Sequence, residues 1–382
     1  MTSTSRSTPT STAADRQFMG LALDQARSAL GRVSPNPAVG AVLVLDGQVV
    51  GSGATQPPPG PHAEVMALRD AGDLARGADL FVTLEPCSHH GRTPPCADAI
   101  IAAGVKRVVA AMQDPHPQVD GGGFDKLRAS GIDVEVGPGA DTARELIGGF
   151  ISRVSTGRPR TTVKYDMTLD GRIATRTGHS RWVSGLQSRE DVHIRRDQCD
   201  AILVGIGTLL ADDPQLTTRL PDNLTGYGGA HHPLRIVLDR QARTPLDARM
   251  LSTETPGDTL IVTSTLASVE RIDALHRSGA QVVTLDKVTP DAVLRQLGER
   301  GINDVLIEGG AGVLGAFFDA GLVDRAAIYI APSIVGGADA PSPIAGCGVA
   351  TMPDAWRLTD RTVTQLGDDI LLEGTLTREQ HV

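Results

Sequence analysis

Aromatic residues are scarce in this sequence, at 3% of 382 residues, and basic side chains are fewer than acidic ones (36 against 45). Proteins that bind nucleic acid usually present a basic surface and stack bases on aromatic rings. No apolar run approaches the roughly 20 residues that a membrane-spanning helix needs. We therefore expect neither nucleic acid nor a membrane among the partners.

Cysteine is also scarce, with four residues in the whole chain, and no disulfide framework is needed to explain them. This usage favours a reducing, cytoplasmic compartment. The first residues are rich in Ser and Thr and lack the apolar segment of a secretory signal. We expect residues 1–14 to form a disordered tail.

The most informative feature is His62-Ala63-Glu64, followed by Cys87 and Cys96. One imidazole and two thiolates hold Zn²⁺ and leave its fourth position to water, whose pKa falls to about 7. A carboxylate such as Glu64, which is not a ligand, can then carry protons between that water and a departing amine. This combination is typical of a zinc-dependent deaminase.

The third ligand is ambiguous on chemistry alone. The usual deaminase pattern, Pro-Cys-x-x-Cys, would place it at position 90, where this chain has His90. The next cysteine is Cys96. Imidazole and thiolate both bind zinc, so either residue could complete the site.

Alternating helix and strand patterns predict two α/β domains joined by a Gly/Pro-rich linker at residues 156–160. We expect a three-layer α/β/α domain over residues 15–156 and a second α/β domain over residues 157–382. The first should hold helices at 18–30, 62–71, 97–103, 123–130 and 145–155, with strands at 39–44, 48–51, 80–84, 107–112 and 133–136. The second should hold strands at 161–164, 201–205, 235–238, 259–263, 281–285, 304–308, 328–331 and 369–374.

A strand that ends at Glu308 runs into a glycine-rich turn, in which Gly310, Gly312 and Gly315 match G-x-G-x-x-G. Backbone N–H groups at such a helix start bind phosphate. A Rossmann fold would need an acidic residue at the end of the next strand, and residues 331–332 are Ala-Pro. We interpret the turn as a phosphate cradle outside a Rossmann fold; glycines that only permit close packing are the alternative.

A set of segments is informative when taken together: residues 35–40, 62–64 and 83–96 in the first half, and 164–171, 178–182, 205–208 and 211–214 in the second, with Arg196, Leu216 and Arg219. These segments resemble the bifunctional deaminase/reductase of riboflavin biosynthesis, and the resemblance extends from about residue 15 to residue 376. The resemblance implies a cytidine-deaminase-like domain with one Zn²⁺ and a dihydrofolate-reductase-like domain that uses NADPH. It also implies a homo-oligomer.

The resemblance assigns residues as well as folds. In the first domain it implies that His62, Cys87 and Cys96 bind zinc, that Glu64 carries protons and that Asn36 orients the substrate. The implied NADPH contacts are Met167, Trp182, Thr208, Asp212, Gly310, Ala311, Gly312, Val313, Leu314, Gly315 and Ala316. The implied substrate contacts, whose arginines suit a ribose 5-phosphate, are Ser180, Arg196, Leu216, Arg219 and Glu308.

The implied reaction has two steps on one phosphoribosylated pyrimidine. Hydrolysis removes the exocyclic amine of 2,5-diamino-6-ribosylamino-4(3H)-pyrimidinone 5′-phosphate, and NADPH then reduces the ribosyl group to ribityl. Asp212 and Glu308 are the candidate general acids of the second step. The alternatives are a nucleic-acid-editing deaminase fused to an unrelated domain and a non-enzymatic zinc- and nucleotide-binding module.

The ambiguity over the third ligand can be tested by comparing two alanine variants. We expect Cys96→Ala to lose zinc and deaminase activity, because it removes a thiolate ligand, and His90→Ala to keep its zinc. Metal analysis of the two purified variants checks this. The reverse result would make His90 the ligand.

Overall fold

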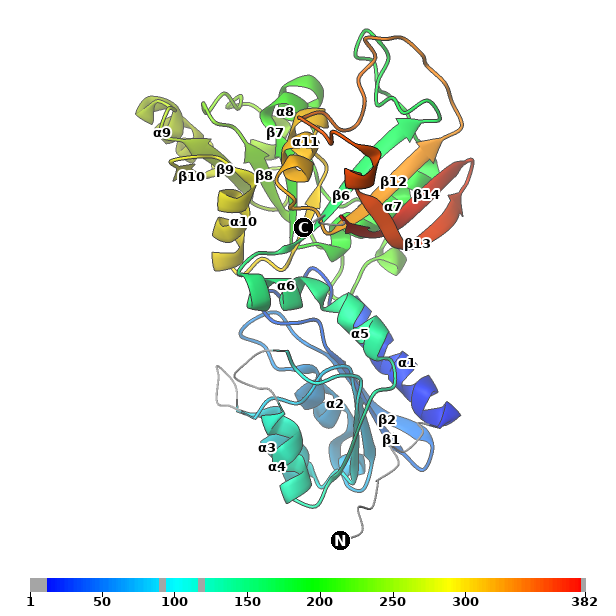
Figure 1. Cartoon of the computed structure of the whole chain (residues 1–382). Helices are drawn as coiled ribbons and strands as arrows, with labels where there is room; N and C mark the ends of the chain where they lie inside the picture. The colour runs from blue at the N-terminus through cyan, green and yellow to red at the C-terminus, as the bar shows by residue number, and fades with distance from the viewer. Residues whose placement is uncertain (1–11, 89–93, 116–120, 379–382) are drawn as a thin grey trace. The chain divides into compact units, whose positions relative to one another are not determined.

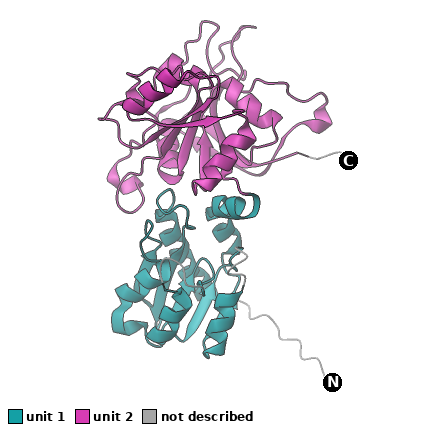
Figure 2. Ribbon diagram, turned by 90° about the vertical axis from the view of Figure 1, so that its left-hand side faces the viewer, with its two compact units in different colours: residues 1–156 teal, residues 157–382 magenta. Residues whose placement is uncertain are grey.

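The computed structural model describes residues 12–88, 94–115 and 121–378, and its chain divides into two compact units, Met1–Thr156 and Gly157–Val382 (Figure 2). Both are α/β units, as predicted. None of the helices in these described ranges combines the length and the apolar character that crossing a bilayer requires.

The first unit is built on a five-stranded sheet with the order β2-β1-β3-β4-β5. Figure 1 labels strands β1 and β2 and the helices α1 to α6 of this unit. A hairpin joins β1 to β2 through a turn at Asp46-Gly47, and β3, β4 and β5 run parallel. Helix α1 packs with α5, while α2, α3 and α4 pack together as a separate group. The bounds are α1 Ala13–Ser28, β1 Gly40–Leu45, β2 Gln48–Ala54, α2 Ala63–Ala71, β3 Asp79–Val82, α3 Cys96–Ala103, β4 Arg107–Ala110, α4 Gly122–Ala129, β5 Asp133–Val136, α5 Ala140–Leu146 and α6 Gly148–Thr156.

Helix α1 begins earlier than predicted, at Ala13, so the end of the predicted tail (residues 12–14) is ordered. Thr12 and Asp15 form a capping box, in which each side chain accepts the backbone N–H of the other. Asp15 also pairs with Arg107, whose guanidinium contacts Asp79 and Glu135 as well. This cluster ties the start of α1 to the three parallel strands.

The helix predicted over residues 145–155 is in fact two helices, α5 and α6. They are separated at Ile147, which is buried and departs from helical backbone angles. Gly148 and Gly149 follow directly, and glycine lowers the stability of a continuous helix. The sequence pattern missed the break because apolar residues continue on both sides of it.

The second unit is built on a nine-stranded sheet with the order β10-β9-β8-β7-β11-β6-β12-β14-β13. Strands from β10 to β12 pair in parallel, and β14 is antiparallel to both of its neighbours. The bounds are β6 Arg160–Thr168, α7 Leu186–Gln198, β7 Ala201–Gly205, α8 Ile206–Asp212, β8 Leu234–Leu238, β9 Thr259–Ser264, α9 Val269–Arg277, β10 Gln281–Leu285, α10 Pro290–Glu299, β11 Asp304–Ile307, α11 Ala311–Asp319, β12 Arg325–Ala331, β13 Arg357–Leu366 and β14 Asp369–Thr377.

Strand β13 was not predicted from the sequence. It is the edge strand, most of its residues are exposed, and its register with β14 shifts between Thr359 and Thr362. Asp360 in that interval has a positive φ of 46°. An exposed and irregular edge strand lacks the alternation of apolar and polar residues by which strands are recognised.

The contact between α1 and β1 yields a stability prediction. A Cβ added at Gly40 would lie 2.0 Å from the carbonyl oxygen of Ala22, whereas one added at Gly20 on α1 would meet nothing within 4 Å. We expect Gly40→Ala to destabilise the first unit by about 1–3 kcal/mol through overpacking. Gly20→Ala should stabilise it by about 0.5–1 kcal/mol. Thermal unfolding checks both, and equal stability of the two variants would contradict this packing.

Candidate functional site

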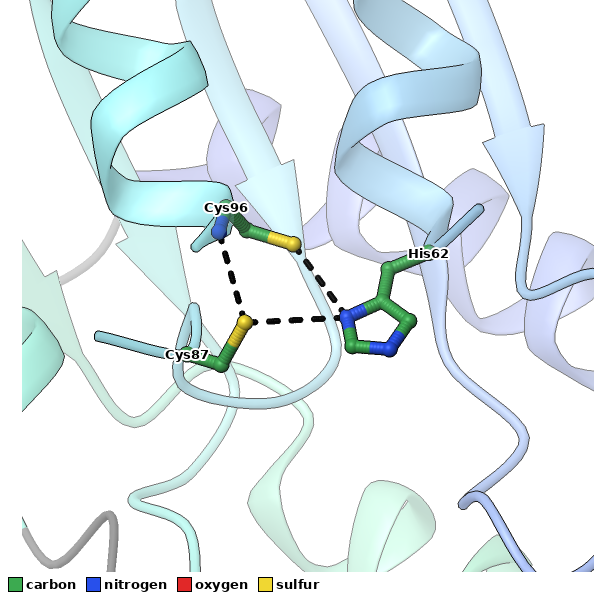
Figure 3. Close-up of side chains that lie close together, drawn as sticks. All are labelled: His62, Cys87 and Cys96. Carbon is green, nitrogen blue, oxygen red and sulfur yellow. Dashed lines mark hydrogen bonds between the residues drawn. The ribbon is translucent and has the colours of Figure 1, made fainter. Parts of the chain in front are cut away.

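The predicted metal ligands converge in the first unit from three separate segments (Figure 3). His62 is the N-cap of α2, Cys87 lies in the loop after β3, and Cys96 is the first residue of α3. The Nδ1 atom of His62 lies 3.7 Å from Sγ of Cys87 and 3.3 Å from Sγ of Cys96. The three ligand atoms all lie within 4.8 Å of one another.

These separations fit a tetrahedral zinc site. With Zn–S of about 2.3 Å and Zn–N of about 2.0–2.1 Å, the edges of the tetrahedron are roughly 3.5–3.8 Å long. The two nitrogen–sulfur distances are close to this range. The competing candidate, His90, lies outside the described residues.

The protein itself prepares a thiolate at this position. The pKa of Cys87 falls to about 4, first because the Cys96 thiol donates a hydrogen bond to its sulfur, and further because His62 and a backbone N–H do the same. The backbone donor is the N–H of Cys96, 3.3 Å from the Cys87 sulfur. The pKa of Cys96 is raised because its proton is held by Cys87 and because it is buried. Cys87 is therefore the sulfur that more readily takes the thiolate form in which cysteine binds zinc.

Glu64 lies in the first turn of α2 and is 3% exposed. Burial raises the pKa of this carboxyl to about 7, although the nearby His62 acts in the opposite direction. A carboxyl group that titrates near neutrality can both accept and return a proton.

The sequence interpretation missed Glu85, two residues before Cys87. Its buried carboxylate accepts four backbone N–H groups, from Asp114, Gly121, Gly123 and Phe124, at 2.9–3.3 Å. One signal in the sequence could have revealed it. An acidic residue stands at the end of an apolar segment, directly before Pro86-Cys87, although zinc binding does not require an acidic residue at that position.

In the second unit, the structure pairs two of the predicted substrate contacts with each other. Arg196 on α7 donates two hydrogen bonds of 2.8 Å to the carboxylate of Glu308, which follows β11. Burial alone would raise the pKa of Glu308, but the charge and hydrogen bonds of Arg196, with help from Lys164, lower it to about 2. A carboxylate this acidic is unsuited to the role of general acid that we had considered for it.

Arg219 lies near this pair and has a different environment. Its backbone N–H donates to Nδ1 of His193 at 3.3 Å, and its guanidinium contacts His193 and Gln215. Among the contacts of the described residues it has no carboxylate partner. Burial lowers the pKa of His193 to about 4, and the neighbouring guanidinium groups of Arg196 and Arg219 lower it further.

The glycine-rich turn after β11 combines two kinds of glycine. Cβ atoms added at Gly309 and Gly315 would collide with Val313 and with the carbonyl of Ala345, so these two glycines are required for packing. One added at Gly312 would meet nothing within 4 Å. The N–H of Gly310 donates to Oγ1 of Thr208 at 3.0 Å, which brings two predicted cofactor contacts together from the starts of α8 and α11.

The remaining predicted contacts lie in the second unit, except Asn36, which lies in the first. Trp182 is 71% exposed, with the guanidinium of Arg189 4.5 Å from its ring centroid. Arg181 donates to the backbone carbonyl of Asp212 at 3.1 Å, which links the segment containing Ser180 to the end of α8. Met167 is half-buried in β6, and Leu216 packs its side chain into the core. Helix α11 carries Ala311, Val313, Leu314 and the exposed Ala316. In the first unit, Asn36 lies half-buried before β1.

Comparison with known proteins identifies both halves. Residues 12–112 match the cytidine and deoxycytidylate deaminase zinc-binding region, and residues 159–372 match the RibD C-terminal domain. The riboflavin biosynthesis protein RibD of Aquifex aeolicus is 41% identical over 358 residues, which cover 94% of this chain and 97% of that protein. The chain belongs to the RibD family. It is a bifunctional deaminase and reductase of riboflavin biosynthesis.

Solved RibD structures have the same architecture over nearly the whole chain. RibD of Acinetobacter baumannii superposes with a TM-score of 0.84 at 38% identity, covering 96% of this chain and 99% of that one. A Thermotoga maritima protein named diaminohydroxyphosphoribosylaminopyrimidine deaminase/5-amino-6-(5-phosphoribosylamino)uracil reductase gives 0.81 at 36% identity, with coverage of 96% and 99%.

These matches settle several of the predictions made from the sequence. The zinc site at His62, Cys87 and Cys96 is confirmed. The RibD reductase domain implies NADPH as the second cofactor. The alternative of an unrelated second domain is wrong, because that half matches the RibD C-terminal domain over residues 159–372.

The Arg196–Glu308 pair predicts acid lability of the second unit. Glu308 has a folded pKa of about 2 against an ordinary 4.5, so its contribution of about 3 kcal/mol is present above pH 4.5 and is lost as the pH falls towards 2. His193 acts in the same direction at higher pH, because its pKa falls from 6.5 to about 4. Stability should therefore begin to decline below pH 6.5.

Urea unfolding of the second unit between pH 7 and pH 3 measures this decline. Glu308→Gln serves as the comparison, because it removes the titrating group: we expect it to be less stable at pH 7 and to show a flatter profile below pH 4.5. A steep profile that persists in Glu308→Gln would show that other groups cause the acid lability.

Proposed function

We propose that the first unit deaminates 2,5-diamino-6-ribosylamino-4(3H)-pyrimidinone 5′-phosphate and that the second unit reduces the resulting uracil with NADPH, converting ribosyl to ribityl. The observation that carries the deaminase half is the convergence of His62, Cys87 and Cys96 beside the buried Glu64. Zinc held by these three ligands would supply a Lewis acid that activates water for attack at neutral pH.

Glu64 is the proposed proton carrier of this half. Its carboxyl group, with a pKa of about 7, takes the proton of the attacking water and returns it to the departing amine. The exit of ammonia leaves the carbonyl of a uracil. Asn36, in the segment before β1, is the proposed orienting contact for the pyrimidine.

In the reductase half, we propose that Arg219 binds the substrate phosphate. Its guanidinium has only His193 and Gln215 as described partners, so its charge is not neutralised by a carboxylate. Arg196 has a different part, because Glu308 already neutralises its charge and the carbonyl of Thr217 accepts a third hydrogen bond from it at 3.2 Å. The Arg196–Glu308 pair is proposed to line the substrate site, and Ser180 and the backbone of Leu216 are the further proposed substrate contacts.

NADPH is proposed to lie along the segments that meet at Thr208 and Gly310. The backbone at Gly312 is open to a ligand, and the start of α11 supplies N–H groups suited to phosphate. Trp182, Met167 and Asp212 are the further proposed cofactor contacts. NADPH bound there would supply the hydride, and the protein would supply position and charge.

We also propose that the protein works in a reducing cytoplasm, since Cys87 and Cys96 bind zinc only as thiolates. Assembly into a homo-oligomer stays a proposal, which the mass of the protein in solution would test.

The two activities should be separable by single substitutions. We expect Glu64→Gln to lower ammonia release by about 10²–10⁴-fold, because the proton carrier is lost, while NADPH oxidation on the supplied uracil product continues. We expect Arg219→Ala to leave ammonia release intact and to raise the KM of the reduction about 10- to 100-fold, since a charge-assisted hydrogen bond contributes about 1.5–3 kcal/mol.

Both assays use the purified full chain, with zinc content measured in each variant. Arg295→Ala is the control for removal of a guanidinium, because Arg295 is exposed on α10 and pairs with Asp291 on the same helix. Normal reduction in Arg219→Ala would refute the phosphate assignment, and undiminished ammonia release in Glu64→Gln would refute the proton carrier.

A further inference from the structure

We propose that Glu85 is a positioning residue of the zinc site, which holds the Cys87 loop in place by capping helix α4. The inference rests on the zinc centre of the proposed function and is independent of the substrate assigned to it. Glu85 does not belong to the group of ligand atoms that gather at the metal position within the described residues.

The carboxylate of Glu85 is fully used by backbone donors. Oε1 accepts the N–H groups of Gly123 and Phe124 at 2.9 and 3.3 Å, and these two residues belong to the first turn of α4. Oε2 accepts those of Asp114 and Gly121 at 3.2 and 3.1 Å. A negative charge at a helix N-terminus is stabilised by the helix dipole. Glu85 therefore supplies the side-chain cap that the N-cap residue of α4, a glycine, lacks.

The same helix start presses on the residue between Glu85 and Cys87. A Cβ at Gly123 would lie 1.9 Å from the carbonyl oxygen of Pro86, so the backbone of α4 touches this loop directly. The ring of Pro86 fixes its φ angle, so the backbone between Glu85 and Cys87 has fewer rotatable angles than it would have with another residue. Cys87 is thereby fixed on its α4 side.

On its other side Cys87 is held by α3. Its carbonyl accepts the N–H of Ala97 at 3.1 Å, and its sulfur accepts the N–H of Cys96 at 3.3 Å. The loop is thus clamped between the first turns of two helices, and one of those turns carries the third metal ligand. Loss of the Glu85 clamp should release one ligand, Cys87, from the position that zinc requires.

Glutamine is the most informative replacement for Glu85, because it keeps the size of the side chain. Its NH₂ group would face two backbone N–H donors, which leaves those donors buried and unpaired. Substitution of residues that orient metal ligands typically lowers metal affinity about 10- to 100-fold. We expect a loss of this size in the zinc affinity of Glu85→Gln.

The experiment measures zinc affinity of the full-length protein by competition with a chromophoric chelator, and the thiolate-to-metal absorption of the Co²⁺-substituted protein. Asp15→Asn is the matched control. Asp15 is a buried carboxylate of the same unit that also accepts a helix-start N–H, but its partners are Thr12 and Arg107, away from the metal loop. We expect Asp15→Asn to lower stability while it keeps the zinc affinity and the Co²⁺ spectrum of the unsubstituted chain.

Gly123→Ala provides a second disturbance of the same clamp if Glu85→Gln does not fold. Weakened metal binding in whichever of the two variants folds, beside normal binding in Asp15→Asn, supports the proposal. Normal zinc affinity in a folded Glu85→Gln, or in Gly123→Ala where only that variant folds, would overturn it. So would failure of both to fold beside a folded Asp15→Asn, because the contacts would then serve the domain as a whole. No substrate is present, so an error in the assigned substrate would not alter these outcomes.

Discussion

The deaminase unit depends on one geometric constraint: an imidazole and two thiols from three segments of the chain must meet within a few ångströms. The fold meets it by ending β3 in a loop and by starting α2 and α3 beside that loop, with His62 and Cys96 at the two helix starts. The backbone N–H of Cys96, at the start of α3, donates to the sulfur of Cys87 and favours its thiolate form. The sheet, the loop after β3 and the starts of α2 and α3 must therefore all be in place before the three side chains can bind zinc.

The two units hold buried carboxylates of opposite character, and one partner accounts for the difference. Glu64 and Glu308 both lose solvent, which by itself raises the pKa of a carboxyl group. Glu64 lies beside an imidazole and thiols, and its pKa is about 7. Glu308 is hydrogen-bonded to the guanidinium of Arg196, and its pKa is lowered to about 2. The first is suited to moving a proton and the second to holding a fixed charge. Burial alone would not have distinguished their roles.

The sequence predicted what depends on local pattern and missed what depends on contacts between distant residues. His62, Glu64 and Cys87 were recognisable because their pattern is tied to one chemistry, whereas the choice of Cys96 over His90 came from the family resemblance. The parallel strands were recognisable because they are continuous apolar runs. Glu85 was invisible because its partners are backbone N–H groups, which carry no side-chain signature. The pairing of Arg196 with Glu308 joins residues 112 positions apart, so a pattern could suggest that each touches substrate but could not show that they touch each other.

The glycine-rich turn shows why a short motif has limited meaning on its own. Three of its glycines match a phosphate-binding pattern, yet their neighbours give them different physical reasons to lack a side chain. Gly315 admits the carbonyl of Ala345, Gly310 approaches the hydroxyl of Thr208, and Gly312 faces open space. Packing therefore explains Gly315 completely, and only Gly310 and Gly312 are left as positions where a ligand could explain the glycine. A sequence pattern weighs all three glycines equally, whereas the contacts around each Cα separate the structural glycine from those available to a cofactor.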